Sequence, residues 1–466
     1  MIFATALRGF LQRRPDALDL LEIEPQTLWL ADDAYQGPFF EFTPGIELFA
    51  SLPGHKLVHS VGVPLGGTKP PDPAQCALIR KTADRLDSPW VSEHLSVGGT
   101  PHQAAGFFLP PLQTDAGVAT AIRNITAFRD AVGRPVAIET GVAYLARKSF
   151  EMPDGEFLAR VAEGADCGIL LDLHNLYCNQ RNGRIRLDET LAQLPLDRVW
   201  EVHLAGGVAQ DGFWLDSHSG PMPDDLKALA GEVLAHLPNL GALNFEIYDT
   251  FLERMPESAL DDTVDALRTL WARVGKSSAD ARPSALPPTP ARPAPSPALW
   301  EAALTEAVWK DGAANHPDSG DAPALRLYAR LARSFRGSML ARTLPRAIRY
   351  LILRERERAD PLLARYYGDV AAKLYAPLEA QAFCDWMTAR DTDPLMQGLL
   401  AYDLALLRIV REGRPQIVHF PGNPGPVFEA LAARRLPAMP DPPVWEMEIL
   451  PDGFSITDFS GVAGPS

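Results

Sequence analysis

The sequence is poor in cysteine and has no long apolar run, and both absences exclude whole classes of protein. Only four of the 466 residues are cysteines, and none of them forms a CxxC pair. Disulfide frameworks and thiolate zinc sites are therefore excluded, and the low cysteine content suits a reducing cytoplasm. No apolar run approaches the roughly 18 residues of a membrane span, which excludes an integral membrane protein. We also expect no signal peptide, because the N-terminal residues lack a basic start followed by an apolar core.

Basic residues are also in the minority. The chain holds 44 Lys and Arg residues against 59 Asp and Glu residues, a net charge of −15. Residues 298–466 hold 19 basic and 21 acidic residues, which leaves 25 against 38 in residues 1–297. So acidic a first part disfavours nucleic acid or an anionic membrane as partner. It suits a site that collects cations, although surface acidity for solubility explains the charge equally well.

A proline-rich segment divides the chain. Seven prolines lie between Pro283 and Pro297, mixed with alanine and serine. This composition favours an extended linker over a helix or a strand. We therefore expect a first domain at residues 1–275, a linker at 276–297 and a second, smaller domain at 298–466.

The first domain alternates short β-like runs with amphipathic helical stretches. In chain order the runs are Ile2–Leu7, Leu20–Glu24, Leu57–Val63, Trp90–Leu95, Val136–Thr140, Ile169–Asn175, Val199–Gly206 and Leu243–Tyr248. Strands that alternate with helices pair in parallel, and eight of them in about 275 residues match a (β/α)8 barrel. The second domain shows mostly helical patterns. The expected fold class is therefore α/β, a TIM barrel followed by a smaller, mostly helical α+β domain.

Most of these runs carry a carboxylate or an imidazole near their C-terminal end. These polar side chains are Glu24, His59, Glu93, His94, Glu139, Asp172, His174, Asn175, Glu201, His203 and Glu246, with Asp216 and His218 just after the seventh run. In a barrel, the C-terminal ends of the strands meet at one mouth, where active sites form. Buried acids and imidazoles are costly unless they pair or bind metal, and this donor set suits zinc, iron or manganese. So many candidates favour two or three ions, with Glu139 and Glu246 as bridges.

Alternation along a strand assigns directions to these side chains. Residues two apart share a face of the strand. The pairs that share a face are Asp172 with His174 and Glu201 with His203. Glu93 and His94 are neighbours and point to opposite faces, so we expect His94 to face the mouth and Glu93 to be a wall partner. A lone His or Glu is usually structural, and it is the recurrence on successive strands that indicates metal.

Seven segments resemble, in order, the pattern of the DUF692 family. They read VHSVGVPLG, WVSEHLS, FFLPPLQT, VAIETGVAYL, GILLDLHNLYCN, VWEVHLAGG and WLDSHSGPMPDD, and the resemblance spans roughly residues 1–272. The family is described as multinuclear non-heme iron-dependent oxidases and includes the methanobactin biosynthesis oxidase subunit. The resemblance implies a xylose-isomerase-like TIM barrel with two or three iron ions. It also implies that O₂ is used to modify cysteine, or other residues, in ribosomally made precursor peptides.

Carried over position by position, the resemblance implies a set of site residues. The implied metal ligands are His59, His94, Glu139, Asp172, Asn175, His203, Asp216, His218 and Glu246, and the implied catalytic residues are Glu139, Asp172 and His203. The chain departs from the family in two motifs. The family often has Asn-Asn where this chain has His174 and Asn175, and the motif around Glu24 matches only loosely. Neither His174 nor Glu24 is therefore assigned as a ligand.

The second domain weakly resembles the partner proteins that recruit the peptide for these oxidases, especially around FCDWM and LLAYDLALLRI. The resemblance implies that oxidase and recruiting partner are fused here, in place of a separate partner protein. Ten arginines lie between Arg326 and Arg358, and arginine pairs well with the carboxylates of an acidic peptide. A solvated helix face is the ordinary explanation of such a run. A net charge of −2 for residues 298–466 argues against DNA binding.

Two other functions use the same residues. A zinc- or manganese-dependent sugar isomerase or phosphodiesterase would share the barrel and its ligands, and a regulatory scaffold would carry a degenerate barrel. Near-complete retention of the ligand types argues against degeneracy. We therefore expect an iron- and O₂-dependent enzyme, which metal content and O₂ consumption distinguish from both alternatives.

Overall fold

The computed structural model describes residues 1–3, 6–31, 38–276, 293–310, 321–373 and 375–451. The predicted linker at 276–297 lies mostly outside these described residues. The chain folds into two compact units. The first unit comprises Met1–Gln26, Ile46–His102 and Phe108–Tyr328, and the second comprises Thr27–Gly45, Gln103–Phe107 and Ala329–Ser466.

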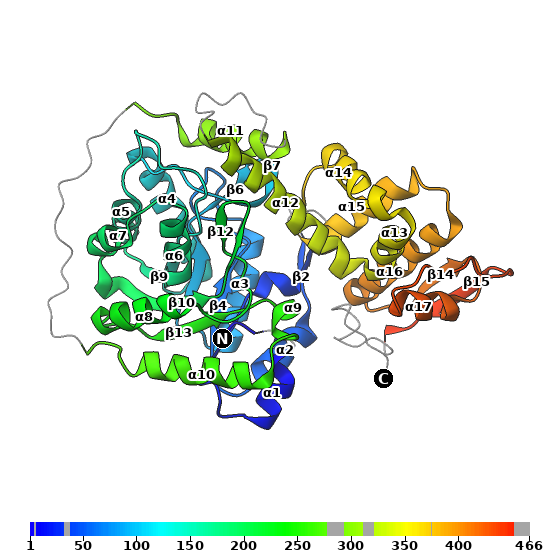
Figure 1. Ribbon diagram of the computed structural model, residues 1–466, viewed down its shortest axis with the longest axis horizontal. Helices are drawn as coiled ribbons and strands as arrows, with labels where there is room; N and C mark the ends of the chain where they lie inside the picture. The colour runs from blue at the N-terminus through cyan, green and yellow to red at the C-terminus, as the bar shows by residue number, and fades with distance from the viewer. Residues whose placement is uncertain (4–5, 32–37, 277–292, 311–320, 374, 452–466) are drawn as a thin grey trace. The chain divides into compact units, whose positions relative to one another are not determined.

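The first unit is built on a seven-stranded parallel sheet, which curves into a nearly closed barrel (Figure 1). In spatial order its strands are β1 (Leu20–Ile23), β4 (His55–Ser60), β5 (Val91–His94), β8 (Val136–Glu139), β9 (Gly168–Asp172), β10 (Val199–Ala205) and β13 (Ala242–Glu246). Every pairing between neighbours is parallel. The predicted TIM-barrel class is therefore confirmed.

We expect from the sequence that Ile2–Leu7 forms the first of eight barrel strands, and this prediction is wrong. Among the described residues of this segment, only Ile2 forms a bridge, and it pairs in parallel with Glu22 of β1. The α-amino group of Met1 lies 3.0 Å from Oδ1 of Asn244 on β13, so this short segment reaches both edge strands. The expected last residue of this strand, Leu7, instead begins a helix.

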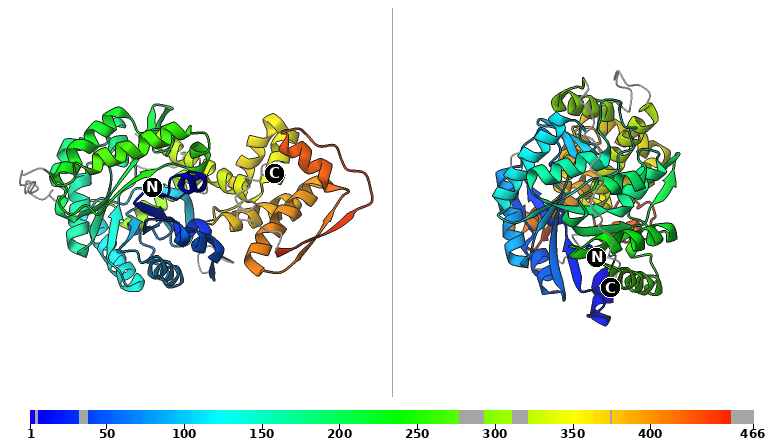
Figure 2. Two further views of the ribbon diagram at one scale, coloured as in Figure 1. Left: turned by 90° about the horizontal axis from the view of Figure 1, so that it is seen from below. Right: turned by 90° about the vertical axis from the view of Figure 1, so that its left-hand side faces the viewer.

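The helices of the first unit surround the strands (Figure 2). They are α1 (Leu7–Arg13), α2 (Thr43–Ser51), α3 (Pro73–Leu86), α4 (Asp115–Val132), α5 (Asp154–Ala165), α6 (Leu173–Arg181), α7 (Leu187–Gln193), α8 (Asp224–Val233), α9 (Asp249–Leu252), α10 (Glu257–Trp271) and α11 (Pro297–Trp309). Two antiparallel hairpins follow barrel strands in the chain, β6 (Val97–Thr100) with β7 (Gln103–Leu109) and β11 (Val208–Gln210) with β12 (Phe213–Leu215). Residues Gln103–Phe107 of β7 belong to the second unit. Local signals explain the boundaries, since Asp72 caps the first turn of α3 and Gly133 ends α4 in the left-handed conformation.

Helix α11 packs on the barrel although it follows the proline-rich segment. The Trp300 side chain is buried, and its Nε1 donates to the Pro110 carbonyl at 3.1 Å. The Glu301 side chain is also buried and accepts from the Thr68 backbone N–H at 2.7 Å. These contacts place α11 with the first unit, whereas the sequence led us to begin the second domain at residue 298.

The first unit continues to Tyr328, which holds the loop that follows β8. Its hydroxyl group accepts from the Tyr144 backbone N–H at 3.0 Å and donates to the Val142 carbonyl at 3.4 Å. Asp321 forms an ion pair with Lys148 of the same loop. Residues beyond the linker therefore complete the packing around the barrel loops.

The second unit is mostly helical, as expected. Its helices are α12 (Ala322–Thr343, shared with the first unit), α13 (Pro345–Glu355), α14 (Ala359–Asp369), α15 (Ala376–Thr388), α16 (Pro394–Glu412) and α17 (Pro424–Ala432). Strands β14 (Gln416–Phe420) and β15 (Trp445–Ile449) form an antiparallel pair beside them, and a second short pair is β2 (Trp29–Ala31) with β3 (Phe39–Glu41). Leu351, Phe383 and Leu399 lie at the centre of its apolar core.

Several arginines of the predicted peptide-binding segment are used inside this unit. Arg336 is buried, and its Nε lies 2.7 Å from Oε1 of the equally buried Glu379. Arg346 pairs with the buried Asp403 at 3.0 Å. Breaking such a buried pair leaves an uncompensated charge. These arginines therefore stabilise the fold, in line with the ordinary, structural explanation of an arginine-rich helix.

Among the described residues, no helix combines the length and the apolar character that crossing a bilayer requires.

We predict that Trp300→Ala destabilises the barrel unit. Removal of a buried indole and its hydrogen bond to the Pro110 carbonyl should cost about 3–5 kcal/mol of unfolding free energy. Leu299→Ala is the matched control, because Leu299 lies on the same helix and its side chain is 66% exposed. Thermal and urea unfolding of the full chain measure the difference, and equal stabilities of the two variants would contradict the packing of α11 on the barrel.

Candidate metal centre

The barrel strands bring six of the predicted ligands to one mouth. The six are His59 on β4, His94 on β5, Glu139 on β8, Asp172 on β9, His203 on β10 and Glu246 on β13. Strand register explains two of the closest neighbours, since His94 pairs with Glu139 and His203 pairs with Asp172. All six lie at or near the C-terminal end of their strand. We call them the mouth cluster.

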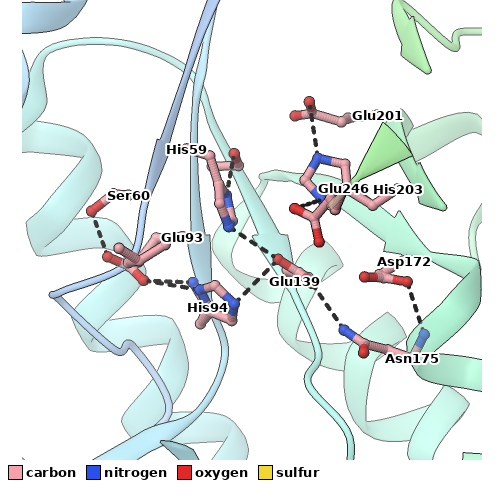
Figure 3. A network of polar contacts seen from close by, with 12 residues as sticks. His59, Ser60, Glu93, His94, Glu139, Asp172, Asn175, Glu201, His203 and Glu246 are labelled. Carbon is pink, nitrogen blue, oxygen red and sulfur yellow. Dashed lines mark hydrogen bonds and ion pairs between the residues drawn. The ribbon is translucent and has the colours of Figure 1, made fainter. Parts of the chain in front are cut away.

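Glu139 stands between two histidines of the mouth cluster (Figure 3). Its Oε2 lies 3.4 Å from Nε2 of His59 and 3.4 Å from Nε2 of His94. The other ring nitrogens face away from it, with Nδ1 of His59 2.9 Å from the Ser92 hydroxyl. Glu93 accepts from the backbone N–H of His94 and lies 3.5 Å from its Nδ1, as a wall residue does.

The carboxylates of the mouth cluster belong to overlapping sets of donors. Among the described residues, four groups of three offer ligand atoms within 4.8 Å of one another. The groups are His59–His94–Glu139, Glu139–Asp172–His203, Asp172–His218–Glu246 and Glu22–Glu201–His203. Glu139 and Asp172 each belong to two groups, whereas the sequence suggested Glu139 and Glu246 as the bridges. The bridging roles stay predictions.

Asp172 ends its strand and starts a helix, which changes the expected direction of the next residues. Its side chain caps α6 by accepting from the Asn175 backbone N–H at 2.8 Å. The expected shared strand face of Asp172 and His174 is therefore wrong, because residue 173 already begins α6. Asn175 nevertheless reaches the cluster, and its Nδ2 donates to Oε1 of Glu139 at 3.0 Å.

Asp216 and His218 reach the cluster from the loop after β12. Oδ1 of Asp216 lies 2.9 Å from Nε2 of His218 and 3.0 Å from Nδ1 of His174. His218 also lies 3.1 Å from Oε2 of Glu246 and has a φ of 43°. A non-glycine residue in this left-handed region costs free energy and is found disproportionately at functional sites. His174 contacts Asp216 and stands behind it.

Two carboxylates that the sequence does not assign as ligands lie behind His203. The sequence pattern does not indicate Glu22 of β1, and it indicates Glu201 of β10 as a strand-borne carboxylate without assigning it as a ligand. Both side chains are fully buried and lie within 3.4 Å of Nε2 of His203. Alternation in the run LLEIE places Glu22 on the same strand face as Glu24, and that signal could have found it. Glu24 itself follows the strand, is partly exposed and belongs to none of the four groups among the described residues.

Burial sets the protonation of the cluster. It raises the pKa of Glu139 to about 8 and that of Asp172 to about 6. It lowers the pKa of His59 well below its usual value. Burial also opposes the charged form of His94, but the carboxylate of Glu139 raises the pKa of His94 to about 9. These directions favour the protonated forms of Glu139 and His94 in the metal-free protein, and a metal dication would displace those protons.

Buried polar atoms that lack a hydrogen bond also indicate a metal site. Within the described parts of the chain, Oε2 of Glu139, Oδ2 of Asp172 and Oδ1 of Asn175 are buried and make no hydrogen bond. Buried polar atoms are rarely left without a partner unless water or an ion completes them. With nitrogen and oxygen donors and no thiolate, the residues fit iron, zinc or manganese. Cys178 lies at the rear of the site, with its thiol 3.7 Å from Nε2 of His174.

Comparison with known proteins identifies the barrel part of the chain. A family model described as RiPP precursor modification enzyme MbnB/TglH/ChrH matches residues 7–255. A UPF0276 protein of Chromobacterium violaceum is 33% identical over 227 residues, which are 48% of this chain and 82% of the relative. A UPF0276 protein of Anaeromyxobacter sp. is 32% identical over 187 residues, 40% of this chain and 66% of the relative.

Solved structures of low sequence identity are also similar to the barrel part. D-psicose 3-epimerase from Clostridium cellulolyticum H10 gives a TM-score of 0.37 at 13% identity, over 59% of this chain and 96% of that one. A xylose isomerase domain protein from Planctomyces limnophilus gives 0.39 at 13% identity, over 57% and 94%.

We predict that Glu139→Gln binds at least one metal ion fewer than the unaltered chain. The amide removes the charge shared by two donor groups but keeps the size of the side chain. His203→Ala should behave similarly, whereas His236→Ala, in the 3-10 turn Leu234–His236 after α8, should be nearly silent. Anaerobic equilibrium dialysis with Fe²⁺ and metal analysis measure the loss, and unfolding temperatures check the fold. Full metal binding by Glu139→Gln would show that the site is placed wrongly on β8.

Proposed function

Because the chain belongs to the MbnB/TglH/ChrH family of RiPP precursor modification enzymes, we propose that it oxidises a residue of a ribosomally made precursor peptide. Cysteine is the residue that we place first. The reaction requires two or three iron ions held at the barrel mouth and uses O₂ as co-substrate. The zinc or manganese isomerase or phosphodiesterase stays the alternative that the experiments below test.

The observation that carries this proposal is the overlap of donor groups around Glu139 and Asp172. A single ion needs about four to six ligands, and the mouth cluster with Asn175, Asp216 and His218 offers nine side chains. Two carboxylates that each serve two neighbouring groups allow ions to lie side by side. Such an arrangement supports a multinuclear centre.

The protein's own residues hold the ions and shape the space above them. His59, His94 and Glu139 would hold an ion at one end of the centre. Asp172, His218 and Glu246 would hold one at the other end, where Asp216 lies beside His218. When bound, iron supplies the redox chemistry by which O₂ oxidises the peptide. The ring centroid of Phe108 lies 4.6 Å from that of His94, so this aromatic side chain packs against that end of the centre.

We predict that the full chain purified without oxygen contains two to three iron ions. It should consume O₂ when a precursor-like peptide encoded beside its gene is added, because peptide oxidation and O₂ reduction are one reaction. Metal analysis, an oxygen electrode and mass spectrometry of the peptide measure these quantities. Stoichiometric zinc, full turnover and no O₂ requirement would instead support the isomerase or phosphodiesterase.

We further propose that the second unit recruits the peptide in place of a separate partner protein. The helical fold of this unit and its exposed arginines support the proposal. Since Arg336 and Arg346 pair inside the unit, the candidates for peptide contact narrow to exposed positions of the second unit such as Arg342 on α12. Arginine at these positions can form forked contacts with an acidic leader.

We predict that the charge reversal Arg342→Glu raises the KM for the peptide and changes kcat much less. The contact acts in binding, away from the reacting atoms. The same reversal at Arg408, which is exposed on α16 outside the arginine-rich segment, is the matched control. Steady-state kinetics at two salt concentrations measure the effect. An unchanged KM at low salt would place recruitment elsewhere.

A further inference from the structure

The three histidines of the mouth cluster share one arrangement. Each directs one ring nitrogen toward a carboxylate of the cluster and the other toward a buried polar side chain behind it. For His59 the rear partner is the Ser92 hydroxyl at 2.9 Å. For His94 it is Glu93, whose Oε1 lies 3.5 Å from Nδ1. His203 follows the same rule but has two carboxylates behind it.

The two ring nitrogens of His203 face opposite ways (Figure 3). Nδ1 lies 2.8 Å from Oε1 of Glu246, on the mouth side. Nε2 lies 3.0 Å from Oε2 of Glu22 and 3.4 Å from Oε1 of Glu201, on the side of the barrel interior. The side chains of His203, Glu22 and Glu201 are all fully buried.

The rear carboxylates are held in place by other barrel residues. Nδ2 of Asn244 donates to Oε1 of Glu201 at 2.8 Å and to Oε2 of Glu22 at 3.2 Å. Nε1 of Trp90 donates to Oε2 of Glu201 at 2.9 Å. Of the four oxygens of these two described carboxylates, only Oε1 of Glu22 is left without a hydrogen bond. The strands β1, β10 and β13 therefore fix the positions of both carboxylates.

A purely structural role explains this arrangement poorly. Two buried carboxylates beside one imidazole cost free energy through desolvation, and apolar residues of similar volume usually stabilise a core better. An imidazole can offer a lone pair to a metal from one nitrogen only while the other keeps its proton. A carboxylate behind that second nitrogen fixes the ring orientation and makes the imidazole a stronger donor.

We propose that Glu22, with Glu201 beside it, is a positioning residue for the metal centre. The Glu22 carboxylate, 3.0 Å from Nε2 of His203, fixes the ring so that Nδ1 stays directed toward the mouth, where it would bind an ion. The inference rests on the proposed function, because it concerns the same centre. It adds a residue outside the ligand set, on the first barrel strand, that sets how tightly and in what geometry one ion is bound.

Glu22→Gln in the full chain tests this role with Co²⁺ as the probe, because the visible absorption of Co²⁺ reports its ligand geometry. The number of ions bound at saturation should stay the same. One of them should bind about 10–100-fold more weakly, and its visible absorption should shift. The metal-free variant should unfold no earlier than the unaltered chain, since the amide keeps the size of the side chain and can still form hydrogen bonds.

Glu301→Gln is the matched control, because Glu301 is a buried carboxylate of the same unit that contacts Thr68 and not the mouth cluster. It should leave Co²⁺ affinity and absorption unchanged. If Glu22→Gln does not fold, Glu201→Gln is tested in the same way.

Three results would overturn the inference. One is wild-type affinity and absorption in Glu22→Gln, and another is an equal change in Glu301→Gln. The third is the complete loss of one ion with the spectrum of the others intact, which would make Glu22 a ligand. An unaltered chain that binds neither Co²⁺ nor Fe²⁺ would contradict the proposed function itself, so the two failures are distinguishable.

Discussion

The carboxylate of Glu139, buried between two imidazoles, is the interaction on which the rest of the site depends. Its oxygens touch His59, His94 and Asn175, which come from three different elements of the barrel. Water is excluded there, so the charges must compensate one another or a cation must compensate them. The barrel brings these groups together by strand register, and the loops and the wall residues then fix their orientation. Both the stability of the fold and the binding of a metal therefore depend on how these side chains are arranged at this end of the barrel.

Sequence reasoning predicted the barrel and the mouth cluster because both follow from local pattern. Parallel strands of a barrel end at one mouth, so strand-borne His59, Glu139 and Glu246 had to converge. It failed where a single residue changes the conformation of those that follow. Asp172 caps a helix and turns His174 away from the strand geometry assumed for it. It also missed Glu22. Strand alternation indicates the face of the strand on which a side chain lies, but not which residue that side chain contacts.

Long-range packing was equally invisible in the sequence. The proline-rich segment is a sound compositional signal, yet the compact barrel unit continues past it, because Trp300 and Tyr328 find partners on loops about 190 residues earlier in the chain. The arginine-rich segment shows the converse. Its composition suggested a binding surface, but Arg336 and Arg346 form ion pairs with Glu379 and Asp403 inside the unit.

Helix α12 belongs to both compact units, with Ala322–Tyr328 in one and the rest of the helix in the other. Because the helix is continuous, it limits the positions at which the chain can be divided into two proteins. If the chain were divided at the proline-rich segment, α11 and Tyr328 would be part of the second protein and not of the barrel protein. The barrel loops that these residues cover would then be exposed to water. Dividing the chain into two expressed proteins therefore requires a junction after Tyr328 and a new start for the severed helix. It would also separate the second unit from its segments Thr27–Gly45 and Gln103–Phe107.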